Sequence, residues 1–237
     1  MSSTVPTFAV IVPVGPGDQN WLHLIEDLRA LPEGTELCFS ATAREPINFG
    51  DLIEGLSHLR VSWRISPPGR ARQLNSGVNQ TSAAWLWFIH GDSRLSQQAV
   101  GKVCGWLKEE HTRDLGYLDL EFTSDGPVWM KITAWGTWFR SRALGLPFGD
   151  QGLCLSRSFF LSLGGFNEKT LYGEDHLLIW RVRRAGGRVT WIGGKILTSA
   201  RKYAKHGWLR TTALHLSLTV RQAIPQAYGL AKERLLR

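Results

Sequence analysis

Two adjacent carboxylates, Glu174 and Asp175, stand at the start of a predicted amphipathic helix in the stretch LYGEDHLLIWRVRRAGG (171–187). Acidic residues in a first turn commonly cap a helix, because they face its unsatisfied N–H groups and the positive end of its dipole. A carboxylate fixed in this way can also act as a general base that takes a proton from an attacking hydroxyl. The local pattern by itself favours capping, so the case for chemistry depends on the rest of the chain.

Cationic and Gly-rich loops follow two of the predicted strands. In PPGRARQLNSG (67–77), Arg70 and Arg72 lie where a loop enters a helix, and guanidinium groups at a helix N-terminus are suited to a diphosphate. The earlier loop PVGPGDQN (13–20), which starts at Pro13 and Val14, has glycines that would admit a phosphate or a base. Solvated arginines and an ordinary Gly/Pro turn are the alternatives, and neither motif alone decides between them.

A third loop carries residues that suit a metal. In WFIHGDSRL (87–95) an almost wholly apolar strand leads straight into His90, Gly91 and Asp92. One carboxylate and one imidazole, with phosphate oxygens and water completing the shell, are adequate ligands for Mg²⁺ or Mn²⁺. An Asp that merely starts a turn is the alternative explanation of this motif.

The elements that must position these loops alternate between strand and helix over the first half of the chain. Apolar, β-branched runs predict strands, and a 3.6-residue periodicity predicts helices. Strands are expected at 8–14, 35–41, 60–66 and 84–90, and helices at 20–31, 49–59, 70–83 and 95–111, the last with Ser96 as N-cap. This order is typical of a parallel sheet covered by helices on both faces, in which ligands bind beyond the carboxyl ends of the strands.

After residue 113 the alternation is less regular. Strands are expected at 116–123 and 188–194, a Trp-rich helix at 128–145, and a strand followed by a short helix within 152–166. A basic helical tail is expected from Tyr203 to Arg237, with an interruption at Pro225. We therefore expect one α/β domain with a nucleotide-binding half (1–113), an acceptor half (114–202) and the tail (203–237).

The composition is that of a globular protein with a basic surface. Hydrophobic residues make up 43% of the 237 residues, and 28 Lys and Arg against 20 Asp and Glu give a net charge of +8. That surplus suits an anionic partner such as a nucleotide diphosphate, a phospholipid surface or a nucleic acid. The basic residues are spread along the chain without a nucleic-acid-binding signature, so we do not expect nucleic acid as the partner.

The expected location is the cytoplasm. Cys38, Cys104 and Cys154 are far apart in apolar settings, as expected for reduced thiols rather than disulfides or metal ligands. The N-terminus does not resemble a signal peptide, and no stretch approaches the roughly 20 apolar residues that span a bilayer. Two interpretations of the basic tail stay open: a helix packed on the domain, or a peripheral helix on the inner face of the membrane.

Six motifs, in order, resemble the family 2 glycosyltransferases, which have the GT-A fold. They are IVPV, GRARQLNSG, WLWFIHGDSRL, LGLPFGDQGLCLSRSFFLSLGGFNE, YGEDHLLIWRVRRAGG and TSARKYAKHGW, and they cover most of residues 8–212. The nearest resemblance is to a small bacterial branch, the radical-SAM/selenodomain-associated transferases. It implies a GT-A-like α/β fold, with a mostly parallel, Rossmann-type central sheet flanked by helices and a helical C-terminal tail. It also implies an enzyme that transfers a sugar from a nucleotide-diphospho-sugar donor.

The resemblance assigns roles to the residues named above. HGD is similar to the family's DxD metal motif, with His90 at its first acid and Asp92 at the metal-binding acid, so Mn²⁺ or Mg²⁺ is the expected cofactor. GED is similar to the family's acidic pair, which makes Asp175 the expected base of an inverting transfer and Glu174 its support. The donor is expected to contact Pro13, Val14, Arg70, Arg72, Asn75, His90, Asp92 and Arg201.

Residues for the acceptor are expected in the second half of the chain. In PFGDQG (147–152), Asp150 and Gln151 supply a carboxylate and an amide that can read sugar hydroxyls, unless the segment is a structural turn. Trp135 and Trp138 flank this side and can stack on a sugar or a lipid, although most tryptophans belong to protein cores. The acceptor stays open between a lipid, a glycan and a small molecule, and the oligomeric state is likewise open.

Two departures from the family pattern keep a rival interpretation open. The acidic turn that usually follows the second strand is replaced by CFSATARE (38–45), and the first acid of the metal motif is His90. Both changes are compatible with an unusual donor, or with a catalytically degenerate protein that only binds nucleotide sugars.

Overall fold

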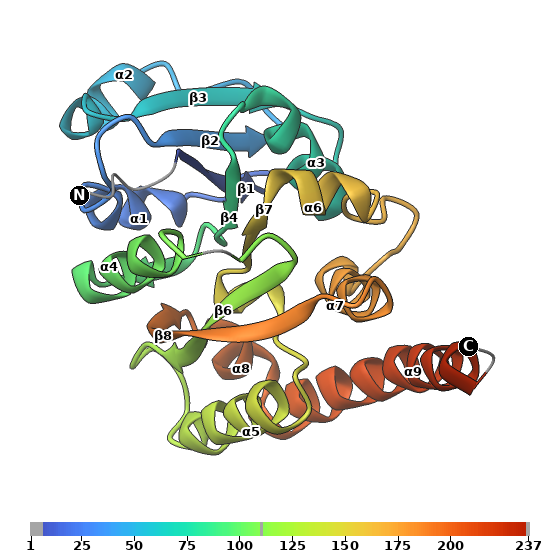
Figure 1. Cartoon of the computed structure of the whole chain (residues 1–237). Helices are drawn as coiled ribbons and strands as arrows, with labels where there is room; N and C mark the ends of the chain where they lie inside the picture. The colour runs from blue at the N-terminus through green and yellow to red at the C-terminus, as the bar shows by residue number, and fades with distance from the viewer. Residues whose placement is uncertain (1–6, 110, 236–237) are drawn as a thin grey trace.

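The computed structural model describes residues 7–109 and 111–235. Its centre is an eight-stranded sheet in the order β3-β2-β1-β4-β7-β6-β8-β5, with helices on both faces (Figure 1). The strands are β1 (Phe8–Val14), β2 (Glu36–Ala41), β3 (Arg60–Ile65), β4 (Trp85–Phe88), β5 (Ser93–Leu95), β6 (Asp114–Phe122), β7 (Cys154–Ser156) and β8 (Arg188–Thr198). All strands except β5 and β7 run in one direction, which confirms the expected, mostly parallel sheet.

The helices follow the predicted order. They are α1 (Trp21–Leu28), α2 (Phe49–Leu52), the 3₁₀ turn η1 (Glu54–Leu56), α3 (Arg70–Gln80), α4 (Gln97–Trp106), α5 (Met130–Ala143), the 3₁₀ turn η2 (Gly149–Gln151), α6 (Arg157–Ser162), α7 (Glu174–Arg184), α8 (Arg201–His206) and α9 (Trp208–Leu235). Ser96 caps α4 as predicted, because its hydroxyl accepts a hydrogen bond from the Ala99 N–H at 3.1 Å.

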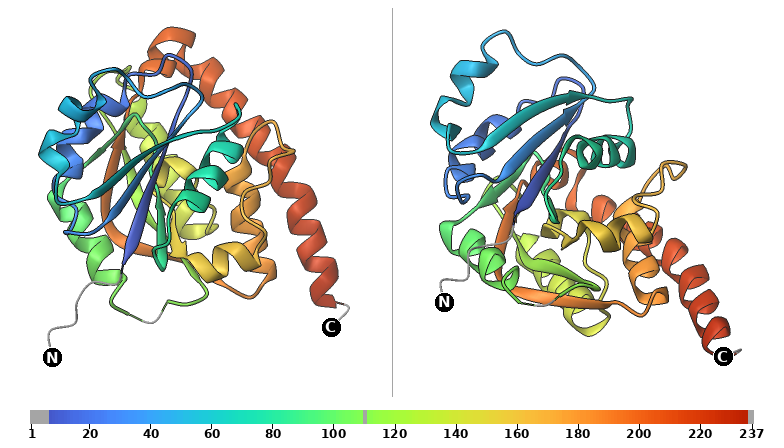
Figure 2. Two further views of the ribbon diagram at one scale, coloured as in Figure 1. Left: turned by 90° about the horizontal axis from the view of Figure 1, so that it is seen from above. Right: turned by 45° about the horizontal axis from the view of Figure 1, so that its top comes forward.

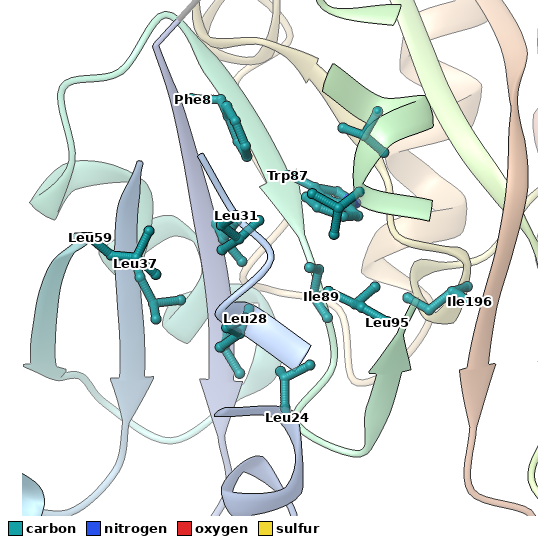
Figure 3. Packing of buried hydrophobic residues seen from close by; sticks show 14 of the residues in the cluster. Phe8, Leu24, Leu28, Leu31, Leu37, Leu59, Trp87, Ile89, Leu95 and Ile196 are labelled. Carbon is teal, nitrogen blue, oxygen red and sulfur yellow. The ribbon is translucent and has the colours of Figure 1, made fainter. Parts of the chain in front are cut away.

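The central strand β1 is buried on both faces. Phe8, Val10 and Val12 pack with α1 and α4 in one core layer, whereas Ala9 and Ile11 pack with α3, α6 and α7 in the other. Figure 3 shows part of the first layer, with Phe8 of β1 and Leu24 and Leu28 of α1. Each fully buried Val or Ile side chain contributes about 1.5–3 kcal/mol of transfer free energy. Two covered faces explain why this strand is a continuous apolar run rather than an alternating one.

The last helix differs from its prediction. The break in the tail lies at Gly207, whose φ is +82°, and α9 continues through Pro225. A proline inside a helix costs about 3 kcal/mol, because it removes a hydrogen bond and crowds the preceding turn. Contacts on both sides of Pro225 favour the helix: the half-buried Ala223 and Leu230 pack against the core, and the Arg184 guanidinium of α7 donates to the Gln226 carbonyl at 3.3 Å. Figure 2 shows α9 running past α7 along one side of the molecule. Residues 236–237 of the predicted tail lie outside the described residues.

Two strands also differ from the sequence analysis. The short strand β5 was not predicted, and β8 continues to Thr198 instead of ending at residue 194. Gly193 and Gly194 have φ of +89° and +99°, and the pairing of β6 with β8 shifts register between Tyr117 and Asp119. The glycine pair therefore marks an irregularity inside a long strand, where it was expected to mark the strand's end.

The thiols agree with expectation. Cys38 and Cys154 are buried, Cys104 is half-buried, and all three are free. Among the described residues, no helix combines the length and the hydropathy that crossing a bilayer requires.

Candidate active site

The carboxyl ends of the parallel strands meet at one edge of the sheet, and the candidate site lies there. β4 leads into His90 and Asp92, β3 leads to Arg70 at the start of α3, and β6 and β8 end at Phe122 and Thr198. All of these residues line one cavity of about 420 Å³. Because β7 runs in the opposite direction, the loop before it brings η2 to the same edge.

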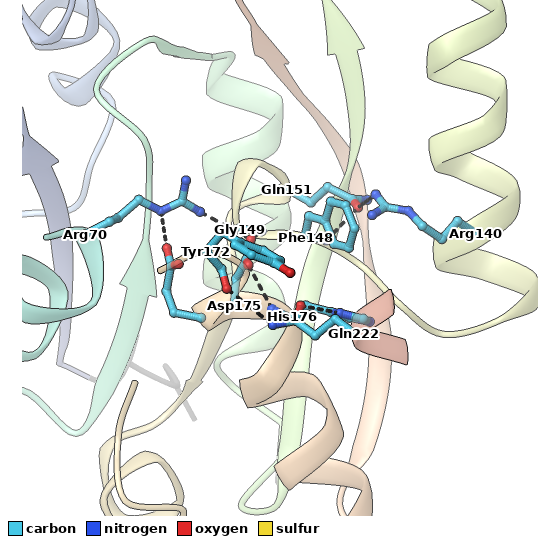
Figure 4. Close-up of polar contacts among 10 residues, drawn as sticks. Arg70, Arg140, Phe148, Gly149, Gln151, Tyr172, Asp175, His176 and Gln222 are labelled. Atoms are coloured by element: carbon cyan, nitrogen blue, oxygen red, sulfur yellow. Dashed lines mark hydrogen bonds and ion pairs between the residues drawn. The ribbon is translucent and has the colours of Figure 1, made fainter. Parts of the chain in front are cut away.

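The acidic pair occupies the first turn of α7 and faces this cavity. Glu174 and Asp175 are only 6% and 7% exposed. The Arg70 guanidinium forms an ion pair with each, with Nε 2.6 Å from Glu174 Oε1 and Nη2 3.2 Å from Asp175 Oδ2 (Figure 4). The predicted diphosphate-binding arginine and the predicted base are therefore neighbours.

The Asp175 carboxylate is held by three protein groups. Besides Arg70, the Gly149 N–H donates to Oδ2 at 2.5 Å and the His176 N–H donates to Oδ1 at 2.8 Å. Burial raises the pKa of Asp175, but the charge of Arg70 and these two N–H groups outweigh it and bring the pKa below its ordinary value. The carboxylate is thus ionised and fixed in orientation, so its cap-like contact with the helix N–H does not exclude a chemical role.

Gly149 is the point on which the site converges. A Cβ added there would lie 2.7 Å from Arg70 Nη2, 2.8 Å from Asp175 Oδ2 and 3.1 Å from His90 Nε2. These distances leave no room for a side chain. A glycine at position 149 is therefore what lets a cation, a carboxylate and an imidazole approach one backbone position.

Asp150 is the second carboxylate of the cavity and differs from Asp175 in its surroundings. Its Oδ1 is buried with no hydrogen-bond partner among the described residues. Burial raises its pKa to about 6, with the charge of Arg140 opposing the shift and that of Asp175 adding to it. Arg140 itself stacks over Phe148, with its guanidinium carbon 3.3 Å from the ring centroid. Asp150 thus has an oxygen available for a ligand's hydroxyl.

The predicted metal residues lie at the end of β4 but are not part of a preformed metal cluster. Among the described residues, no three His, Cys, Asp or Glu side chains come together as a metal site. Burial, together with the nearby charge of Asp18, raises the pKa of Asp92, and Lys202 opposes that shift. Burial and the charge of Arg70 lower the pKa of His90 well below its ordinary value, so the imidazole is neutral and able to bind a metal. These donors fit Mg²⁺ or Mn²⁺ only if diphosphate oxygens and water complete the shell, which is how Mg²⁺ is usually bound.

The end of β1 is also at this edge, through its backbone. Gln73 joins the buried ends of β1 and β2. Its Nε2 donates to the Val14 carbonyl of β1 at 2.7 Å and to the Ser40 carbonyl of β2 at 2.8 Å. Pro13 is half-buried beside them. Donor contact by Pro13 and Val14 stays a prediction.

Three other predicted donor residues make contacts away from the acidic pair. Arg72 is exposed and donates to the Pro68 carbonyl at 3.4 Å. Asn75 exchanges two hydrogen bonds of 2.9 Å with the backbone of Phe166 and so fixes the loop before α7. Arg201 donates to Asn20 Oδ1 at 2.5 Å and thereby joins the start of α8 to the loop after β1. None of these three side chains lines the cavity.

The predicted acceptor residues are also only partly in the cavity. Asp150 lines it, but Gln151 is completely buried, with its amide bonded to Ser141, Phe148 and Leu118. Gln151 is thus a structural residue, in place of the expected acceptor contact. Trp135 and Trp138 are exposed on α5 and do not line the cavity.

Part of the cavity wall was not predicted. Its far side is α9, where the Gln222 amide oxygen lies 2.8 Å from His176 Nδ1. The Trp180 indole N–H donates to His176 Nε2 at 3.0 Å, so His176 is neutral and donates its Nδ1–H to Gln222. Lys202 and Tyr203 of α8 also line the cavity. A Gln on a basic amphipathic tail, such as Gln222, carries no signal of this kind in the sequence.

Comparisons with known proteins support the fold. No protein-family model matches the chain, and no curated protein sequence matches it. The mannosyltransferase PcManGT from Pyrobaculum calidifontis, in complex with GDP-Man and Mn²⁺, superposes with a TM-score of 0.65 at 14% identity, over 94% of this chain and 65% of that chain. S. aureus TarS 1-349 in complex with UDP-GlcNAc gives 0.60 at 14% identity, over 81% of this chain and 58% of that chain. The chain spans less than two thirds of either protein, and the similarity shows a GT-A-like fold.

Proposed function

We propose that this protein is a glycosyltransferase that moves a sugar from a nucleotide-diphospho-sugar to an acceptor hydroxyl, with inversion at the anomeric carbon. The observation that carries the proposal is the convergence of Arg70, His90 and Asp175 on Gly149 at the carboxyl edge of the sheet. Supporting it, solved structures with the same fold contain UDP-GlcNAc, UDP or GDP-Man. The family 2 motifs found in the sequence point to the same chemistry.

In this proposal Asp175 is the general base. It takes the proton of the acceptor hydroxyl while that oxygen forms a bond to the anomeric carbon. The bond between the anomeric carbon and the diphosphate oxygen breaks, and its electron pair leaves with the diphosphate. A single displacement of this kind inverts the configuration, and it needs an ionised carboxylate in a fixed orientation, which Asp175 provides.

Cationic side chains are proposed to receive the diphosphate. Arg70 is partly exposed and is paired with the acidic residues in the free protein, so a bound diphosphate would compete for its guanidinium. Lys202 lies close enough to His90 and Asp92 to affect the pKa of both. These two cations would stabilise negative charge as it develops on the leaving group.

Asp92 and His90 are the proposed metal residues, with Mn²⁺ or Mg²⁺ as the expected ion. A divalent cation bound there would neutralise charge on the leaving diphosphate. Asp18, whose charge acts on Asp92, is a further carboxylate at this position. Asp150 is proposed to accept a hydrogen bond from a sugar hydroxyl through its unpartnered oxygen.

The rival function is a degenerate protein that binds nucleotide sugars without transferring them. The observation that favours it is the end of β2 at Ala41, which brings no carboxylate to the donor edge. Turnover separates the two functions, since both predict binding.

The test is a thermal-shift screen of UDP- and GDP-sugars with and without Mn²⁺, followed by a donor-hydrolysis assay. A ligand that binds only the folded protein raises its melting temperature. We expect at least one donor to bind and to be hydrolysed slowly, with Asp175→Asn binding but not hydrolysing it. Asp51→Asn, at an exposed position of α2, is the matched control. Donor binding without any hydrolysis by the wild type would favour the degenerate protein.

A further inference from the structure

An apolar groove opens next to the polar cavity. It has a volume of about 870 Å³ and lies between α5 and the turn that joins α8 to α9, with Pro127, Trp129, Ile132, Tyr203, Trp208 and Leu209 in its walls. Trp208 holds the two sides together, because its indole N–H donates to Thr133 Oγ1 at 2.8 Å and its ring lies 6.1 Å from that of Trp129. Tyr203 lines both the groove and the polar cavity, so the two spaces are adjacent.

Large apolar side chains are also exposed on the two helices that border this groove, α5 and α9. Trp135 is 64% exposed and stacks on the exposed Phe139, and Leu209 is 75% exposed. Further exposed apolar residues on the same two helices are Trp129, Ile132, Trp138, Leu214, Leu216, Val220, Ile224 and Tyr228. A concentration of this kind marks a surface that binds something apolar.

The charges on the same segments have one sign. Residues 126–143 and 201–232, which form α5, α8 and most of α9, contain no Asp or Glu. Their exposed basic residues are Lys131, Arg201, Lys202, Lys205, Arg210, Arg221 and Lys232. Two further arginines of α5 point inward, because Arg140 stacks over Phe148 and Arg142 pairs with Asp119. Exposed tryptophans combined with cations alone are the pattern of helices that lie in the interface of an anionic bilayer. A surface that binds another protein does not need charges of one sign, whereas a surface that binds an anionic bilayer needs positive charges.

We infer that the acceptor is a membrane lipid: α5, α8 and the first half of α9 dock on an anionic bilayer, and the groove takes the lipid's hydrocarbon chain. This rests on the proposed function. The lipid's hydroxyl-bearing headgroup passes Tyr203 into the polar cavity, towards Asp150 and Asp175. Figure 1 shows α5, α8 and the start of α9 together on one side of the sheet, which leaves that side free to face a membrane.

The docking surface is tested by co-sedimentation with vesicles. We expect the wild type to sediment with vesicles of phosphatidylcholine and phosphatidylglycerol, and far less with phosphatidylcholine alone. Each basic residue near an anionic surface contributes about fivefold in affinity, so Lys131→Glu with Lys205→Glu should weaken binding at least about 25-fold. Both lysines are exposed and neither lines the cavity. The matched control is Arg60→Glu with Arg64→Glu on strand β3, at the far edge of the sheet.

The groove is tested separately with a short-chain, monomeric phosphatidylglycerol and calorimetry. Ala204 lines the groove and is exposed, so Ala204→Trp should fill the space and weaken lipid binding at least tenfold. Ala30→Trp, at an exposed position beside the end of α1, is the control and should bind as the wild type does.

Three results would overturn the inference: no sedimentation with either vesicle, an equal loss in the Arg60 and Arg64 control, or unchanged lipid binding in Ala204→Trp. Self-association that Trp135→Ser abolishes, without vesicle binding, would assign the surface to a second copy of the chain instead. The thermal-shift screen with nucleotide sugars uses no lipid. Donor binding without lipid binding therefore overturns this inference alone, and an absence of donor binding overturns the proposed function.

Discussion

Replacing Asp150 and Asp175 in turn by Asn should change stability in opposite directions. Asp150 has a pKa of about 6 in the folded protein, compared with an ordinary value of 3.8. The folded state therefore holds a proton that the unfolded state has lost between these two values, and stability falls as the pH rises through that window. At 1.36 kcal/mol per pKa unit, the ionised carboxylate costs the folded protein up to about 3 kcal/mol at pH 7. Asp150→Asn should recover part of that, and the gain should vanish below about pH 4.

Asp175→Asn should lower the stability of the folded protein at pH 7. The folded protein lowers the pKa of Asp175, so its stabilising effect is present above the ordinary value and is lost as the pH falls through the folded value. Asn keeps a hydrogen-bond acceptor for the Gly149 N–H but loses the charge that pairs with Arg70. Hydrogen bonds to charged groups contribute about 1.5–3 kcal/mol, so we expect a loss in that range at pH 7.

The kinetic effects should separate the two carboxylates further. A missing general base lowers turnover by 10²–10⁴-fold, so Asp175→Asn should lose at least about a hundredfold in kcat with donor binding retained. Asp150→Asn should mainly raise KM. In the wild type, kcat/KM should fall about tenfold per pH unit below pH 6 as Asp150 gains its proton, and this limb should be absent in Asp150→Asn. Arg140, Arg70, Asp175 and Asp92 are the charged groups that act on Asp150, and Asp150 in turn raises the pKa of Tyr203.

Urea denaturation at pH 7 and pH 4, together with steady-state kinetics from pH 5 to pH 8, measures all of these effects, with Asp51→Asn as the control. The reasoning is refuted if Asp150→Asn loses a hundredfold in kcat while Asp175→Asn loses activity only in proportion to its stability. Asp150 would then be the base, and Asp175 would serve only to hold Arg70. An unchanged stability of Asp150→Asn at pH 7 would show that burial does not perturb this carboxyl.

Three other changes test the site. Gly149→Ala should abolish turnover in a hydrolysis assay, because the added Cβ would lie 2.7 Å from Arg70 Nη2 and 2.8 Å from Asp175 Oδ2. The control Gly136→Ala should be active, because a Cβ at that position has no atom within 4 Å. Equal activity of the two variants would contradict the convergence of the site on Gly149. Asp92→Ala should remove the Mn²⁺ dependence of donor binding without unfolding the protein, as followed by thermal shift, and an unchanged dependence would exclude Asp92 as a metal ligand. Arg70→Gln should weaken binding of a nucleoside diphosphate more than that of the nucleoside, by calorimetry, and an equal loss would argue against a phosphate contact.

Most of the fold could be predicted from the sequence, because its elements are determined by local patterns. β1 and β4 are short apolar runs that only a sheet covered on both faces accommodates. The helices α1 and α3, which follow β1 and β3, show helical periodicity in the sequence. The N-cap of α4 is likewise local, because the Ser96 hydroxyl accepts a hydrogen bond from the N–H of Ala99, three residues later. Where a local signal was ambiguous, the prediction was wrong: Gly193 and Gly194 look like the end of a strand, but pairing with β6 carries β8 through them.

The sequence by itself also determined which residues the loops bring to the carboxyl edge of the sheet, since Arg70, His90, Asp92 and Asp175 follow recognisable strands or start a helix. Only the tertiary structure decided how they meet. Gly149 lies 79 residues after Arg70 and 26 residues before Asp175 in the sequence, yet the three meet in the site. No local sequence pattern predicts a contact between segments so far apart. Only the tertiary structure placed Gln151 in a buried hydrogen-bond network. Likewise, Gln222 is part of the cavity wall only because α9 continues through Pro225 and packs against α7, where Gln222 bonds His176. Long-range packing is cooperative, so the free energy that places these side chains belongs to the whole core and not to their own segments.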